Sequence, residues 1–198
     1  AGEGGYASEL ATGDVNNDGI HEIFVSAPLE DAMATDSGVV YMYDPSDGDL
    51  YDIDATFQGE GDGENFGVTV AAGSDINADG LGDLLIAGRL GGNTWQVHIF
   101  FGAVSGFSGT FGTADADTVL SGEMEELDDR LALGFAPDLN GDGANELLIG
   151  TPDAGDYGEG MAYLMLSSLV WDDGLFGTSD VRFAPYGNDD ENLGADVG

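Results

Sequence analysis

The stretch GDVNNDGIHEIFVSAP, residues 13–28, decides the fold of this chain. Its first half places short acidic and amide side chains around a glycine, and its second half becomes a continuous apolar run. The same arrangement returns as SDINADGLGDLLIAGR from residue 74 and as PDLNGDGANELLIGTP from residue 137. The leading aspartates of the three copies are 61 and 63 residues apart, which indicates an array of repeats.

Each repeat is predicted to form four short strands. One strand precedes the acidic loop, and three follow it in every copy. The predicted later strands lie at 22–28, 38–44 and 50–59, at 83–88, 95–102 and 115–122, and at 146–152, 160–166 and 179–187. Connectors such as 102–117 are too rich in glycine for helices. Four strands per repeat of this length are typical of a β-propeller blade, whereas the repeats of a β-solenoid are shorter.

The predicted fold is therefore all-β, with three four-stranded propeller blades and the first strand of a fourth. We expect one domain over residues 1–198, a partial or open propeller with repeats at about 1–62, 63–125 and 126–188. Residues 189–198 open the fourth repeat, because ENLGADVG at 191–198 matches GENFGVTVAAG from residue 63. An acidic loop joins the first and second strands of each blade.

The shared loop pattern, D-x-N-x-D-G-x-x-[DE], predicts a calcium site. Short side chains at positions 1, 3 and 5 of a curled loop point to its centre, a glycine turns at position 6, a carbonyl faces inward at position 7, and position 9 closes the shell. The fifteen predicted ligands are Asp14, Asn16, Asp18, Ile20, Glu22, Asp75, Asn77, Asp79, Leu81, Asp83, Asp138, Asn140, Asp142, Ala144 and Glu146. We expect about three Ca²⁺ per chain. Mg²⁺ prefers a smaller octahedral shell, and zinc and copper prefer nitrogen or sulfur.

A single loop of this kind would also suit an Asx-rich turn without a metal, since Asp, Asn and Gly are ordinary turn residues. Three copies with the same five positions, each leading into an apolar strand, favour the calcium interpretation.

The charge of the chain restricts its partners. There are 39 acidic residues against three arginines, and the formal net charge is -36. Nucleic acid and anionic membrane surfaces would be repelled, so neither is an expected partner. The excess also suits a heavily solvated surface in a saline environment. There is no cysteine, which excludes disulfides and thiolate metal sites.

The three acidic loops and the segments around them resemble the FG-GAP repeats of the integrin α-subunit propeller and of its bacterial secreted relatives. The FG pair is Phe66 and Gly67 in the second repeat, and GAP corresponds to SAP at 26–28 and GTP at 150–152. The resemblance implies that each loop joins the first two strands of a blade and binds calcium through positions 1, 3, 5, 7 and 9. Glutamate at position 9 of two loops departs from the family's commoner aspartate. The family closes seven blades into a ring, and here there are three.

Other candidate residues are better explained as structural. His21 and His98 have no recognisable catalytic partners, and Trp95 and Trp171 suit a blade core better than a sugar platform. The acidic segments 44–49 and 152–160 read as turns, with an accessory cation as the alternative.

We therefore predict a non-catalytic, calcium-binding extracellular module with a structural, adhesion or assembly role. It would bind a protein partner or associate with itself. The alternatives are a propeller lectin that binds glycans, or an accessory domain of a larger secreted enzyme.

Overall fold

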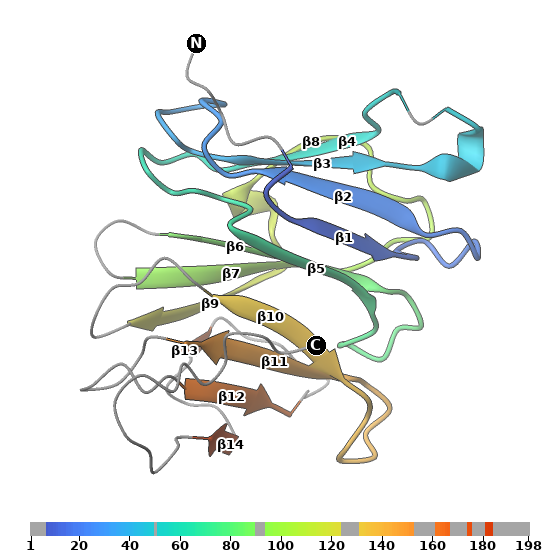
Figure 1. The fold of residues 1–198 in the computed structure, drawn as a ribbon. Coiled ribbons are helices and arrows are strands. Elements are labelled where there is room, and N and C mark those ends of the chain that lie inside the picture. Colours follow the sequence, from blue (N-terminus) through green and yellow to red (C-terminus); the bar gives the residue numbers. More distant parts are fainter. Residues whose placement is uncertain are drawn as a thin grey trace.

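The computed structural model describes residues 7–49, 51–89, 94–123, 131–152, 161–166, 174–175 and 181–183. They form three sheets stacked one above the other, one sheet for each repeat (Figure 1). Helix in these residues is limited to the 3₁₀ turns η1 (Pro45–Asp47) and η2 (Thr113–Asp115), and no described helix is long and apolar enough to span a bilayer. The prediction of an all-β fold of propeller-like blades is confirmed.

The first sheet is built from four strands of the first repeat and one strand of the second. Its strands are β1 (Leu10–Gly13), β2 (Glu22–Ala27), β3 (Val39–Tyr43), β4 (Ala55–Gln58) and β8 (Gly109–Gly112). β1 to β4 pair antiparallel in chain order, as expected for one blade. β8 pairs parallel to the outer edge of β4, with Ala55 opposite Gly109.

The second sheet repeats this plan. Its strands are β5 (Thr69–Ser74), β6 (Asp83–Arg89), β7 (Thr94–Phe100), β9 (Thr118–Glu123) and β13 (Gly174–Leu175). β13 comes from the third repeat and pairs parallel to β9. The third sheet contains β10 (Ala132–Ala136), β11 (Glu146–Thr151), β12 (Met161–Met165) and β14 (Val181–Phe183).

The fifth strand is the feature that the sequence did not predict. Each repeat supplies four antiparallel strands, as expected, and β8 and β13 are additions. Both come from the connector between the third and fourth strands of the following repeat, and both cover the outer edge of the preceding sheet. The connector therefore links one blade to the next. The limits of the repeats stay predictions, and the segment 189–198 lies outside the described residues.

Two apolar cores lie between the three sheets. Phe24, Met42 and Phe57 of the first sheet pack with Leu84 and Ile86 of the second. On the other face of β6, Leu85 and Ala87 pack with residues of the third sheet that include Leu147 and Ile149. β6 is therefore buried on both faces, as its apolar run predicts. In β2, by contrast, Ile23 and Val25 are only half-buried, because among the described residues the first sheet has a neighbouring sheet on one side.

The innermost strands approach each other through glycine. β5 contacts both β1 and β10. A Cβ on Gly13 would lie 2.4 Å from the Cα of Gly73, so no side chain fits at this crossing. Gly73 also occupies an irregularity in the β5–β6 pairing and has a φ of 95°, which favours glycine.

The FG pair packs between the first and second blades. Phe66 is fully buried in the core between them, and its amide donates to the carbonyl of Ser37 at 3.0 Å. Gly67 has a φ of 91°, and a Cβ there would lie 2.8 Å from Cγ2 of Val40. Phe66 and Gly67 are thus packing residues between blades.

Candidate metal-binding loops

Each acidic loop connects the first two strands of its sheet. Loop 1 (residues 14–22) runs from β1 into β2, loop 2 (75–83) from β5 into β6, and loop 3 (138–146) from β10 into β11. The last residue of each loop is also the first residue of a strand. The structure therefore places all fifteen predicted ligands in three equivalent turns.

Position 1 and the loop glycine close each turn in the same way. A carboxylate oxygen of the leading aspartate accepts a hydrogen bond from the amide at position 6, at 2.9, 2.8 and 3.0 Å in loops 1, 2 and 3. The glycines at position 6 have φ values of 87°, 87° and 97°. Only glycine takes up this backbone conformation without strain, which explains its presence in all three loops.

Positions 3 and 5 curl the loop further. The amide oxygen of the asparagine at position 3 accepts from the backbone amide of position 5 at 2.9, 3.0 and 2.8 Å. The carboxylate at position 5 accepts from the amide of position 7 at 2.7, 2.8 and 3.0 Å. These bonds use only part of the accepting capacity of each oxygen, so the side chains can accept further interactions from the same positions.

The carboxylates at position 9 are fully buried at the base of the loops. Glu22, Asp83 and Glu146 each have 0% of their surface exposed. Each accepts a hydrogen bond from the backbone amide at position 2, at 2.9 Å in loop 1, 2.8 Å in loop 2, and 3.1 and 3.0 Å to the two oxygens in loop 3. The longer glutamate and the shorter aspartate thus reach the same amide.

Burial, and to a smaller extent neighbouring carboxylates, favours protonation of Asp83 and Glu22. Burial raises the pKa of Asp83 to about 7, and the carboxylates of Asp79 and Asp75 add to the increase. Burial also raises the pKa of Glu22, with smaller contributions from Asp44 and Asp14. A bound cation would reverse this effect by stabilising the ionised forms. With only three arginines in the chain, such compensation cannot come mainly from basic side chains.

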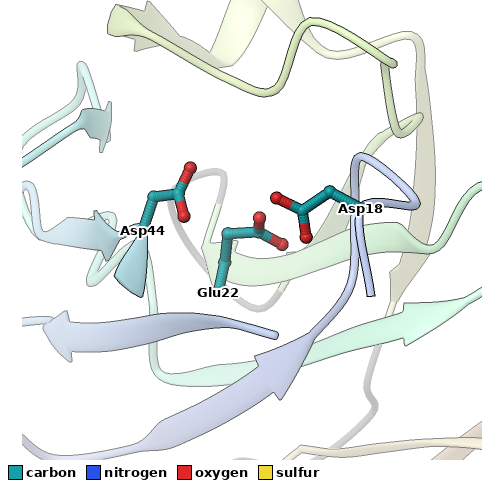
Figure 2. A group of neighbouring side chains, drawn as sticks. All are labelled: Asp18, Glu22 and Asp44. Carbon is teal, nitrogen blue, oxygen red and sulfur yellow. The ribbon is translucent and has the colours of Figure 1, made fainter. Parts of the chain in front are cut away.

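Loop 1 has an additional acidic neighbour that was not among the predicted ligands. Oxygens of Asp18, Glu22 and Asp44 all lie within 4.8 Å of one another. Figure 2 shows Glu22 between the other two side chains. Asp44 follows β3 and caps η1, where its Oδ1 accepts from the amide of Ser46 at 2.8 Å. The sequence places Asp44 in the turn 44–49, for which an accessory cation was the alternative interpretation.

The other candidate residues from the sequence are better explained as structural wherever the structure describes them. Trp95 is 2% exposed, and the guanidinium of Arg89 lies 4.9 Å from the centre of its ring, so Trp95 cannot serve as an open sugar platform. His98 is buried against Phe66, and His21 is exposed. Trp171 and residues 153–160 lie outside the described residues.

Four-stranded antiparallel units, each with an acidic Asx–Gly loop between its first two strands, define the chain as an array of β-propeller blades. The family model of the FG-GAP repeat matches residues 6–43 and 131–165, which include loops 1 and 3. Loop 2 has the same geometry. Two of the three repeats thus match the FG-GAP repeat, and the repeats are similar to those of integrin α-subunits.

Comparison with known proteins leads to the same class. The chain is 38% identical to integrin alpha-E of Mus musculus over 87 residues, which is 40% of this chain and 7% of the mouse protein. It is 27% identical to integrin alpha-5 of Xenopus laevis over 156 residues, 73% of this chain and 14% of that protein. It is 29% identical to integrin alpha-PS5 of Drosophila melanogaster over 151 residues, 75% of this chain and 15% of that protein. The chain thus spans a small fraction of the length of these relatives.

Proposed function

We propose that the chain is a non-catalytic, calcium-binding propeller module with an adhesion or assembly role outside the cell. Each loop would hold one Ca²⁺ through the residues at positions 1, 3, 5, 7 and 9. The observation that carries this proposal is the repetition of one geometry in three loops. The oxygens of positions 1, 3, 5 and 9 are held by backbone amides of the loop in the same pattern each time.

The donor set favours calcium over other cations. Every predicted ligand atom is a carboxylate, amide or carbonyl oxygen, which suits a hard dication. Loops built from flexible turn residues adapt to the six to eight ligands of Ca²⁺ more readily than to the strict octahedron of Mg²⁺. The absence of cysteine from the sequence removes the thiolates that zinc or copper would prefer.

Loop 1 is expected to bind calcium most tightly. It contributes three carboxylates at positions 1, 5 and 9, as loops 2 and 3 do, and Asp44 adds a fourth nearby. The residues that follow the equivalent strands β7 and β12 are Phe101 and Leu166, which bear no charge. Calcium affinity rises with the number of charged ligands, so Asp44→Asn should weaken one of three sites.

The role outside the cell is supported by the similarity to integrin α-subunits and by charge. The net charge of -36 disfavours nucleic acid and anionic lipid, so a protein surface is the expected partner. A second copy of the chain carries the same charge, so self-association would depend on calcium and salt to reduce the repulsion. The loops would order the blade edges that such a partner meets. Sedimentation with calcium and with chelator would test this role, and a monomer in both conditions would contradict self-association.

Calcium titration by calorimetry, with elemental analysis after dialysis, tests the metal proposal directly. We expect about three ions per chain, and a rise in melting temperature that chelator reverses. Magnesium at the same concentration should give a smaller rise. A stoichiometry near zero with the fold intact would contradict the proposal.

A further inference from the structure

Loops 2 and 3 contact each other across the boundary between the second and third sheets. The backbone amide of Asn145 donates to the carbonyl of Asp75 at 2.8 Å. The side chain of Asn145 donates through Nδ2 to Oγ of Ser74 at 2.9 Å, and its Oδ1 accepts from the backbone amide of Asp138 at 3.1 Å. The half-buried side chain of Asn145 therefore connects Ser74, the residue before loop 2, with Asp138, the first residue of loop 3, while its backbone amide holds Asp75.

The backbone part of this contact also occurs between loops 1 and 2. Gly82, at position 8 of loop 2, donates its amide to the carbonyl of Asp14 at 3.2 Å. Asn145 occupies position 8 of loop 3, so the two contacts are equivalent. A Cβ on Gly82 would lie 2.5 Å from the Asp14 carbonyl oxygen, and no side chain can bridge there. The contact is thus a regular feature of blade stacking, to which Asn145 adds a side-chain bridge.

We propose that Asn145 and Ser74 are positioning residues that couple cation binding at loops 2 and 3. The inference rests on the proposed function, because it takes both loops to be calcium sites. Asp75 supplies the first ligand of loop 2, and its carbonyl is held by Asn145. An ion in loop 2 orders Asp75 and Ser74, and these in turn hold Asn145 in place.

Ordering of Asn145 prepares the neighbouring site. Its Oδ1 holds the amide of Asp138, which supplies the first ligand of loop 3. Loop 3 then loses less conformational freedom when its own ion binds, and its affinity rises. By linkage, an ion in loop 3 raises the affinity of loop 2 by the same factor. Repulsion between the two ions acts in the opposite direction, and it is reduced by the coordinating carboxylates and by salt.

Calcium titrations of the full chain can measure the coupling. Asp18→Ala disables loop 1 in all proteins. In this background, adding Asp142→Ala leaves loop 2 as the one functional loop, and adding Asp79→Ala leaves loop 3. The Asp18→Ala protein without a further change is the parent, and it keeps both loops. We expect the two-loop protein to saturate at calcium concentrations about 5-fold or more below those given by the sum of the single-loop isotherms.

Two variants test the bridge without changing a ligand. Asn145→Ala removes both side-chain bonds, and Ser74→Ala removes only the acceptor of Nδ2. In each, the two-loop isotherm should move toward the sum of the single-loop isotherms measured in the same background. His21→Ala is the matched control, because His21 occupies position 8 of loop 1 and is exposed. It should leave the coupling unchanged.

The possible results separate this inference from the proposed function. Two-loop binding equal to the sum of the single loops in the parent would overturn the coupling while leaving the calcium sites in place. Coupling that persists in both Asn145→Ala and Ser74→Ala would overturn the role of the bridge. If no protein binds calcium, the proposed function itself is wrong, and the coupling falls with it.

Discussion

At the scale of single residues, the loops combine turn chemistry with concentrated negative charge. Asp79 illustrates both roles, because its Oδ1 accepts from the amide of Leu81 at 2.8 Å while the residue occupies position 5 of loop 2. A turn residue matters equally with and without a metal, whereas a ligand matters only when the metal is present. The calcium dependence of a substitution therefore distinguishes the two roles.

We expect Asp79→Ala to lower the melting temperature by several degrees in calcium and by much less in chelator. A ligand present at a hundredfold excess over Kd stabilises the folded state by about 2.7 kcal/mol, whereas each of the two exposed hydrogen bonds that the Asp79 carboxylate accepts contributes about 1 kcal/mol or less. Thermal unfolding in both buffers measures the difference. Asp52→Ala, an exposed aspartate outside the loops, is the control for the lost charge. Equal losses in both buffers would show that Asp79 serves the turn alone.

His98 carries a different residue-scale prediction, which concerns acid stability. It is 2% exposed, its Nδ1 has no hydrogen-bond partner among the residues that the structure describes, and burial lowers its pKa to about 4. The unfolded chain binds a proton near pH 6.5, so this contribution to stability is complete above that pH and is lost as the pH falls toward 4.

His98→Gln should therefore reduce the pH dependence of unfolding. Between pH 7 and pH 4 the parent should lose up to about 3 kcal/mol more than the variant. Urea unfolding at several pH values measures both, and titration of the many carboxylates cancels in the comparison. Parallel pH profiles would mean that His98 is protonated equally in the folded and unfolded states.

At the scale of secondary structure, the added strand β8 is attached through aromatic packing. Phe111 stacks on Phe57 of β4, with ring centres 5.0 Å apart and planes at 16°. Phe100 and Phe107 meet the same two rings edge on, with centres between 4.9 and 6.3 Å apart. This aromatic cluster contains residues of both repeats, so side-chain packing explains why the parallel strand β8 lies along β4.

Phe111→Ala should release β8 from the edge of the first sheet. A large-to-small change at a buried phenylalanine costs about 3–5 kcal/mol, and the half-buried Phe111 should cost somewhat less. Denaturant unfolding measures the loss, and hydrogen exchange should show weaker protection in β4. Thr110→Ala, at the exposed neighbouring position, should change stability by less than about 0.5 kcal/mol. Unchanged exchange in β4 would show that β8 adds no protection.

At the scale of the whole molecule, the blades are held together by close backbone contacts at their inner strands. Gly13 and Gly73 meet where β1 and β5 cross, and Gly82 packs on the carbonyl of Asp14 beside them. These contacts set the distance between blades and, with it, the distance between the loops.

Gly13→Ala should force the first two blades apart. The added methyl group would meet backbone atoms of β5 at 2.4 to 2.6 Å, and backbone cannot rotate away as a side chain can. Overpacking of this kind costs about 1–3 kcal/mol, and more where backbone must move. Gly61→Ala is the control, because its Cβ would be 3.5 Å from the nearest atom. Equal stabilities of the two variants in denaturant unfolding would show that the crossing adapts freely.

Much of the architecture could be predicted from the sequence because it depends on local spacing. The period of the acidic loops indicates repeats, the apolar runs after them indicate strands, and the glycine at position 6 follows from the turn it must make. The fifteen loop positions lie in equivalent turns for the same reason. Their role as calcium ligands stays a proposal that the titrations will test.

The tertiary structure alone decided which distant groups meet. The fifth strands, the approach of Asp44 to Glu22, and the bridge from Asn145 to Ser74 across 71 residues have no local signature. The unequal burial of β2 and β6 likewise depends on having one neighbouring sheet or two. A short sequence segment specifies the shape of its own turn or strand, whereas these features depend on how the blades stack. That stacking results from the packing of side chains and glycines across the whole array.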